Sequence, residues 1–139
     1  MKKSILTLLV SIAMAVPVTA ETLTVVIESL ASTDGHIMLR ILAGEQEFDG
    51  DVEAITSIKQ RALAGDNTFT VANLPAGDYG LQIMHDKNSN GKLDSNFVGM
   101  PTEPWGFSNN ATGNMGPPAW SDVKFSLSGK VTQLITLNK

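Results

Sequence analysis

Apolar side chains recur at every second position in several short runs, which is the spacing of β-strands that bury one face. Residues 23–28 and 36–42 show this alternation first, and the turn residues Thr33-Asp34-Gly35 between them predict a hairpin. Further extended runs occur at 55–63, 68–72, 79–85, 123–127 and 131–137. The pattern therefore predicts an all-β fold, an antiparallel sandwich of about seven strands with one long ordered loop at 86–122.

A compact corner precedes the fifth of these runs. In Leu74-Pro75-Ala76-Gly77-Asp78-Tyr79, the proline restricts one backbone dihedral and the glycine permits a sharp turn. The segment resembles the corner of immunoglobulin-like and prealbumin-like sandwiches, in which a tyrosine hydroxyl bonds back to nearby backbone. We therefore expect Tyr79 to have a structural role.

The segment from Gly44 to Glu53 is rich in acids and interrupts the strand pattern. Its carboxylates are Glu45, Glu47, Asp49, Asp51 and Glu53. Because these like charges lack the spacing of metal ligands, we interpret the segment as a solvated loop.

The first residues have the composition of an export signal. Lys2 and Lys3 precede an apolar run at 5–16, and Val18-Thr19-Ala20 is a small-residue cleavage signal. The run is shorter than the roughly 20 residues that span a bilayer, so we predict cleavage after Ala20 and no membrane span afterwards. We expect residues 1–20 to be a signal peptide and 21–139 to be one periplasmic or secreted β-sandwich domain.

Charge and cysteine content limit the classes of function. Cleavage after Ala20 removes two lysines and no acid, so the formal charge changes from −4 to −6. An acidic chain without basic clusters is poorly suited to phosphate backbones, and we expect no nucleic-acid partner. With no cysteine in the chain, disulfides and thiol catalysis are excluded.

The first part of the long loop has oxygen-bearing side chains at the spacing of a calcium loop. Asp86, Asn88, Asn90, the Lys92 carbonyl and Asp94 occupy alternate positions around Gly91. An EF-hand has a bidentate glutamate at position twelve, where this chain has Phe97, and its flanking helices are not predicted here. We therefore expect a weak, structural calcium site. The alternative is a loop held by Asx turns without a metal.

A carboxylate from elsewhere in the loop is a possible further ligand for this cation. Glu103 and Asp122 are the candidates, together with a backbone carbonyl. Only two formal charges lie in the first nine residues of the loop, and a low charge count is typical of weak calcium sites.

The rest of the loop contains both tryptophans among many glycines and prolines. Aromatic and amide side chains of this kind stack on sugar rings or grip peptides when they are exposed, and pack the loop when they are not. We interpret the segment as a ligand-binding loop for a small molecule, a glycan or an envelope protein. Its candidate residues are Phe97, Glu103, Trp105, Phe107, Asn109, Asn110 and Trp120.

A copper-binding protein and an enzyme are two alternatives to a binding module. His36, His85 and four methionines (Met38, Met84, Met100 and Met115) include the ligand types that copper prefers, although no His-x-His or Met-rich run occurs. No nucleophile elbow or zinc-hydrolase spacing is present, and we expect no enzyme. A purely structural envelope domain is the main alternative.

Several motifs together resemble one bacterial family. They are the corner at 74–79, the loop from His85 to Asp94, and the segments Gly106-Phe107-Ser108-Asn109-Asn110 and Gly116-Pro117-Pro118. This combination is similar to the exported bacterial domain-of-unknown-function family number 2141, over essentially the whole mature chain. The resemblance implies an exported, single-domain β protein with no assigned activity.

Overall fold

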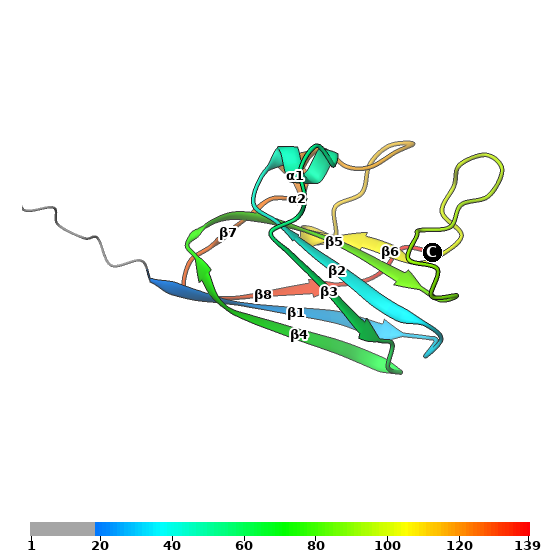
Figure 1. Cartoon of the computed structure of the whole chain (residues 1–139), viewed down its shortest axis with the longest axis horizontal. Coiled ribbons are helices and arrows are strands. Elements are labelled where there is room, and N and C mark those ends of the chain that lie inside the picture. Colours follow the sequence, from blue (N-terminus) through cyan, green and yellow to red (C-terminus); the bar gives the residue numbers. More distant parts are fainter. Residues whose placement is uncertain (1–18) are drawn as a thin grey trace, which may run out of the picture.

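The computed structural model describes residues 19–139 and contains two β-sheets that enclose one core (Figure 1). The smaller sheet has the order β4-β1-β8, and the larger has the order β3-β2-β5-β6, with β7 paired to β5. The strands are β1 Ala20–Leu30, β2 His36–Leu42, β3 Thr56–Arg61, β4 Gly65–Pro75, β5 Gly77–Asp86, β6 Trp105–Phe107, β7 Phe125–Leu127 and β8 Lys130–Ile135. The short helices are α1 Glu45–Asp49, the 3-10 turn η1 Ser108–Asn110, and α2 Trp120–Val123. The predicted all-β sandwich is confirmed.

Alternation along the strands builds the core, as the sequence predicts. In β1 the buried side chains are Leu23, Val25 and Ile27, and in β2 they are Ile37, Leu39 and Ile41. Burial of each such side chain stabilises the fold by roughly 1.5–3 kcal/mol before conformational entropy is counted. The intervening residues of β2 and β5 therefore point to the opposite, outer face of the larger sheet.

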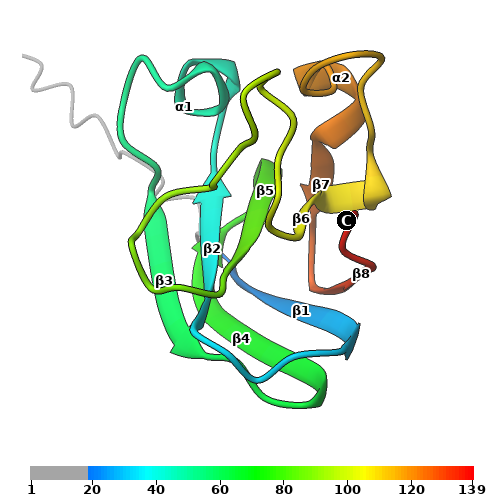
Figure 2. The same cartoon turned by 90° about the vertical axis from the view of Figure 1, so that its right-hand side faces the viewer.

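The predicted hairpin between the first two strands is wrong. β1 pairs with β4 and β8, whereas β2 pairs with β3 and β5, so the two strands lie in different sheets. The connection at 31–35 crosses from one layer to the other (Figure 2). Alternation identifies the buried face of a strand but not its neighbour, because strands side by side and strands in opposite layers both bury one face in the core.

Three further features differ from the sequence-based expectation. Part of the acidic segment forms α1, and the carboxylate of Glu47 accepts the N–H groups of Ala43 and Ile55 at 2.8 and 3.2 Å. The structure has an eighth strand, β6, in the segment expected to be loop. The pairing of β1 with β8 is parallel, although an antiparallel sandwich was expected. No helix in residues 19–139 has the length and apolar composition needed to cross a membrane.

The corner before β5 has the predicted geometry. The Tyr79 hydroxyl donates a hydrogen bond to the Pro75 carbonyl at 2.7 Å, and its ring is buried. Burial, and to a smaller extent the Glu47 carboxylate, raises the pKa of Tyr79 above its ordinary value of 10.0. The tyrosine thus has the structural role that the motif predicts.

The free energy of unfolding is expected to fall at alkaline pH because Tyr79 loses its proton. The pKa of Tyr79 is higher in the folded chain than in the unfolded chain. The stabilisation that the protonated hydroxyl provides is therefore complete below pH 10, and it is lost as the pH rises through the pKa of the folded state. Tyr79→Phe should remove this part of the alkaline loss and cost about 1 kcal/mol at neutral pH, since the Pro75 carbonyl loses its donor. Tyr79 is the only tyrosine, so phenol absorbance titration reports on it alone. A titration midpoint at or below the ordinary value would contradict the prediction.

Candidate functional site

The outer face of the larger sheet presents two rows of side chains that cross three strands. The register aligns Met38 of β2 with Met84 of β5, and Met84 with Trp105 of β6. The adjacent row consists of Arg40, Gln82 and Phe107. All six are partly buried, although they lie on the face opposite the core. Other segments must therefore cover this face.

Two loop segments border this face and form, together with it, an open cavity of about 670 Å³. One is the long segment between β5 and β6, which extends beyond the end of the larger sheet (Figure 1). The other lies between η1 and α2. The cavity is lined by Met38, Arg40, Gln82, Ile83, Met84, Gly91, Lys92, Leu93, Ser95, Gly99, Met100, Pro101, Trp105, Gly106, Phe107, Gly113, Met115, Gly116 and Pro117.

The cavity walls are mostly apolar. Four methionines, Met38, Met84, Met100 and Met115, come from two strands and two loops, and two aromatic rings join them. Methionine side chains are flexible and polarizable, so a surface rich in them adapts to ligands of different shape. A cavity of a few hundred cubic ångströms with apolar walls and few polar groups is typical of small-molecule sites.

The predicted calcium loop begins at the buried end of β5. Asp86 is fully buried, and its two carboxylate oxygens accept the N–H groups of Asn90 and Gly91 at 3.0 and 2.8 Å. Gly91 has a φ of 79°, which favours glycine. The carboxylate thus holds the turn in the way expected of an Asx-type loop.

The other predicted ligands lie around the same turn. The amide groups of Asn88 and Asn90 both donate to the Asp94 carboxylate, and the Lys92 N–H donates to the Asn90 side-chain oxygen at 2.9 Å. Within residues 19–139, no three His, Asp or Glu side chains are grouped to hold a metal ion. The loop is therefore ordered by hydrogen bonds, and calcium binding remains a prediction.

Glu103 connects the two ends of this loop. It is buried, and its carboxylate oxygens accept the N–H groups of Lys87 at 2.8 Å and Asp94 at 3.1 Å. The Asp94 carbonyl in turn accepts the N–H of Thr102 at 2.7 Å. Of the two further carboxylates suggested by the sequence, Glu103 thus lies against the loop, whereas Asp122 lies in α2.

The predicted aromatic ligand-binding residues occupy three different environments. Phe97, in the long segment between β5 and β6, is completely exposed, whereas Trp105 and Phe107 line the cavity. Trp120 is outside the cavity lining and packs on Phe48, with ring centroids 6.0 Å apart. Phe48 also contacts Phe107 at 5.8 Å. The tertiary structure thus brings only two of these four predicted aromatics into one site.

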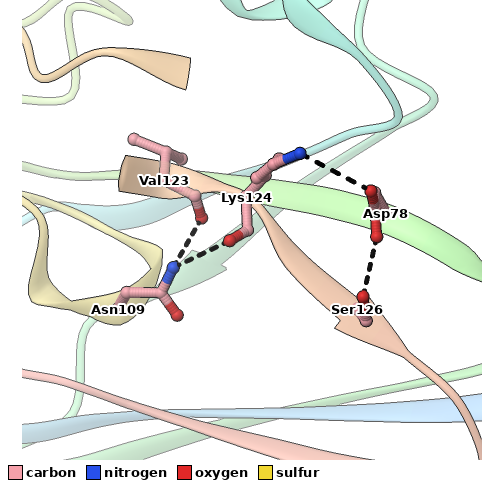
Figure 3. Close-up of polar contacts among 5 residues, drawn as sticks. All are labelled: Asp78, Asn109, Val123, Lys124 and Ser126. Carbon is pink, nitrogen blue, oxygen red and sulfur yellow. Dashed lines mark hydrogen bonds and ion pairs between the residues drawn. The ribbon is translucent and has the colours of Figure 1, made fainter. Parts of the chain in front are cut away.

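The two predicted asparagines hold the chain together beside the cavity. The Asn109 amide donates to the carbonyls of Val123 and Lys124 at 3.1 and 3.0 Å (Figure 3). Asn110 donates to the Leu134 carbonyl and accepts the Thr136 N–H. These contacts join η1 to α2 and to the end of β8, so both asparagines have structural roles.

Nearby, Asp78 ties β5 to β7. Its carboxylate accepts the Ser126 hydroxyl at 2.8 Å and lies 3.9 Å from the Lys124 ammonium group (Figure 3). Both partners of this ion pair are about half exposed, so its expected contribution is small.

Among the strand residues of the cavity floor, Trp105 and Phe107 were selected from the sequence as ligand-binding residues, Met38 and Met84 were named only as copper ligands, and Arg40 and Gln82 were not selected. Alternation placed Met38 and Arg40 on the face opposite the core, but an outward position normally means solvent. His85, considered for copper, is buried on the core side and contacts the Asp34 carbonyl at 2.7 Å through Nε2. It therefore lies on the face of β5 opposite to Met84.

Comparison with known proteins gave one match. The model of a family described as "Uncharacterized protein conserved in bacteria (DUF2141)" matches residues 25–135. Neither a curated protein nor a solved structure matches the chain.

Proposed function

The chain belongs to the bacterial DUF2141 family, and we propose that it is an exported, non-catalytic module that binds a small, largely apolar molecule. The observation that carries this proposal is the cavity of about 670 Å³ between the outer sheet face and the two loop segments. Its floor belongs to paired strands and its roof to loops, an arrangement typical of binding sites on rigid scaffolds. The export signal predicted at residues 1–20 supports a periplasmic or secreted location; residues 1–18 lie outside the described residues.

The methionine and aromatic walls support an apolar ligand. Met100 and Met115 are 61% and 99% exposed, although they line the same cavity as the partly buried Trp105. A ligand that covered these side chains would remove apolar surface from water, which stabilises the complex by about 25 cal/mol for each Å² buried. The same surface would be costly for a domain with a purely structural role.

Binding of a neutral, environment-sensitive dye tests this proposal. We expect Nile red to bind the wild-type protein and to gain fluorescence, because it exchanges water for the apolar walls. Met84→Glu in the floor and Met100→Glu in the roof should each weaken binding at least about tenfold, since each places a charge against the ligand. Fluorescence titration, together with melting curves for every variant, measures the effect.

Leu134→Glu is the matched control. Leu134 is an exposed apolar residue of β8 and does not line the cavity, so this change should leave Nile red affinity unchanged. Absence of Nile red binding to the wild type, or equal loss in all three variants, would contradict the cavity as the binding site and favour the structural role.

We further propose that a weak calcium ion braces the roof of the cavity. Asp86 and Asp94 lie in one turn with the amides of Asn88 and Asn90, and Glu103 accepts the Asp94 N–H; hard oxygen donors of this kind suit calcium. The amides now donate to Asp94, but rotation of each amide by half a turn would present its oxygen instead. A calcium ion would compete with backbone N–H groups for the carboxylates of Asp86 and Glu103, so binding is expected to be weak.

Calcium should raise the melting temperature of the wild-type protein. For a dissociation constant of about 1 mM, 10 mM calcium stabilises the folded state by about 1.4 kcal/mol, which corresponds to a few degrees. Asp94→Ala should abolish the increase, because it removes the carboxylate at which both amides meet. Asp51→Ala, at an exposed acid outside the loop, is the control. An identical melting temperature with calcium and with a chelator would refute the proposed calcium site.

A further inference from the structure

The charged residues that line the cavity are positive, whereas the net charge of the whole chain is negative. The chain has 14 acidic and 10 basic side chains, yet the cavity is lined by Arg40 and Lys92 and by no aspartate or glutamate. Apolar side chains beside a charge lower the local dielectric constant and thereby strengthen its effect on a ligand. This cavity therefore favours an anion, although the chain as a whole has a net negative charge.

Arg40 is held in a defined position in the cavity wall. It is partly buried on β2, and its Nη1 donates to the Gln82 side-chain oxygen of β5 at 2.7 Å. Gln82 is itself oriented, because its amide donates to the Phe48 carbonyl at 3.3 Å. Two neighbouring strands and α1 thus orient the guanidinium group before any ligand arrives.

The guanidinium group retains unused capacity for an anion. An arginine has five N–H donors, and one bond to Gln82 leaves most of them free for a ligand. Among the residues that the structure describes, the only ion pair within 4.0 Å joins Lys124 and Asp78. Arg40 therefore has no carboxylate partner in this part of the chain, even though acids outnumber bases.

From this arrangement we propose that the ligand is an amphipathic carboxylate. Its apolar body lies against the methionines and Trp105, and its carboxylate accepts hydrogen bonds from Arg40. The planar guanidinium group matches a carboxylate with two parallel N–H···O bonds. Lys92 lies on the exposed loop and contributes a second, flexible positive charge. This inference rests on the proposed binding function and specifies the chemical class of its ligand.

One oriented guanidinium group selects a monoanion over a phosphate dianion. Phosphate sites usually gather several cations or backbone N–H groups, as at a helix N-terminus or a glycine-rich loop. Here the residues that line the cavity include a single arginine and a single lysine. A carboxylate carried by an aliphatic or aromatic body satisfies both the charge and the apolar walls.

Displacement of Nile red by a matched pair of ligands tests this inference. Decanoate and 1-decanol have similar apolar chains and differ in the head group. We expect decanoate to displace the dye from the wild-type protein at about one-tenth of the concentration that decanol requires, because charge-assisted hydrogen bonds exceed neutral ones. In Arg40→Gln this preference should disappear, and the affinity for Nile red, measured separately in each variant, converts the displacement curves into ligand affinities.

Arg61→Gln supplies the control for a general loss of positive charge. Arg61 lies on β3 of the same sheet, is exposed, and does not line the cavity, so the preference for decanoate should persist in this variant. Equal displacement by the two ligands in the wild type, or a preference that survives in Arg40→Gln, would overturn the inference. Because Nile red is uncharged, its binding reports on the cavity itself, and the two proposals can fail separately.

Discussion

Gly35→Ala is expected to lower the free energy of unfolding by about 3 kcal/mol or more. Gly35 has a φ of 66°, and an added Cβ would overlap the Asp86 carbonyl oxygen and lie 2.7 Å from the carbonyl group of Lys87. These are backbone atoms at the paired ends of β2 and β5, so they cannot move without disrupting the pairing of His36 with Asp86. Denaturant unfolding measures the loss.

The size of the steric contribution follows from comparison with Gly50→Ala. Gly50 also has a positive φ, 85°, at the end of α1, but an added Cβ there meets no atom within 4 Å. Gly50→Ala should therefore cost only about 1 kcal/mol, the usual cost of alanine in this backbone conformation. Similar losses in the two variants would show that contact with the end of β5 is unimportant.

Glu103→Ala is expected to release the cavity roof and to weaken Nile red binding at least about tenfold. The change leaves the N–H groups of Lys87 and Asp94 without their acceptor, and hydrogen bonds to a charged group contribute about 1.5–3 kcal/mol each. Because the released residues 91–93 line the cavity, their increased motion should lower affinity. Hydrogen exchange of the loop amides, followed beside the dye titration, connects the two effects.

Two comparisons separate this effect from a simple loss of charge. Glu103→Gln retains one acceptor but places an amide N–H₂ against the second donor, so intermediate exchange and affinity are expected. Glu53→Ala removes an exposed acid between α1 and β3, and it should change neither the hydrogen exchange of the loop amides nor the affinity for Nile red. Unchanged exchange at Lys87 and Asp94 in Glu103→Ala would show that the carboxylate does not hold the loop.

The sequence was informative about local features. Alternation identified which faces of β1, β2 and β5 are buried, because a two-residue period is a property of each strand alone. The spacing from Asp86 to Asp94 identified the polar turn for the same reason, since its hydrogen bonds connect residues a few positions apart. The Pro75–Tyr79 bond is equally local.

The candidate site was only partly predictable. Trp105 and Phe107 were selected as ligand-binding residues and do line the cavity, but Asn109, Asn110 and Trp120 instead hold neighbouring segments. The local sequence around an aromatic residue is the same whether its ring faces a ligand site or packs inside the loop. The distinction depends on which residues lie opposite, and those are distant in the chain.

The sequence by itself determined the all-β class, the buried faces, the tyrosine corner and the polar turn at the end of β5. Only the tertiary structure decided that β1 and β2 lie in opposite sheets, and that two loops cover the outward face of β2 and β5. The physical reason is that local patterns specify how a segment buries its own surface, whereas a cavity arises from contacts between segments far apart in the chain. Met38, Arg40, Met84 and Met100 become one site only through those contacts.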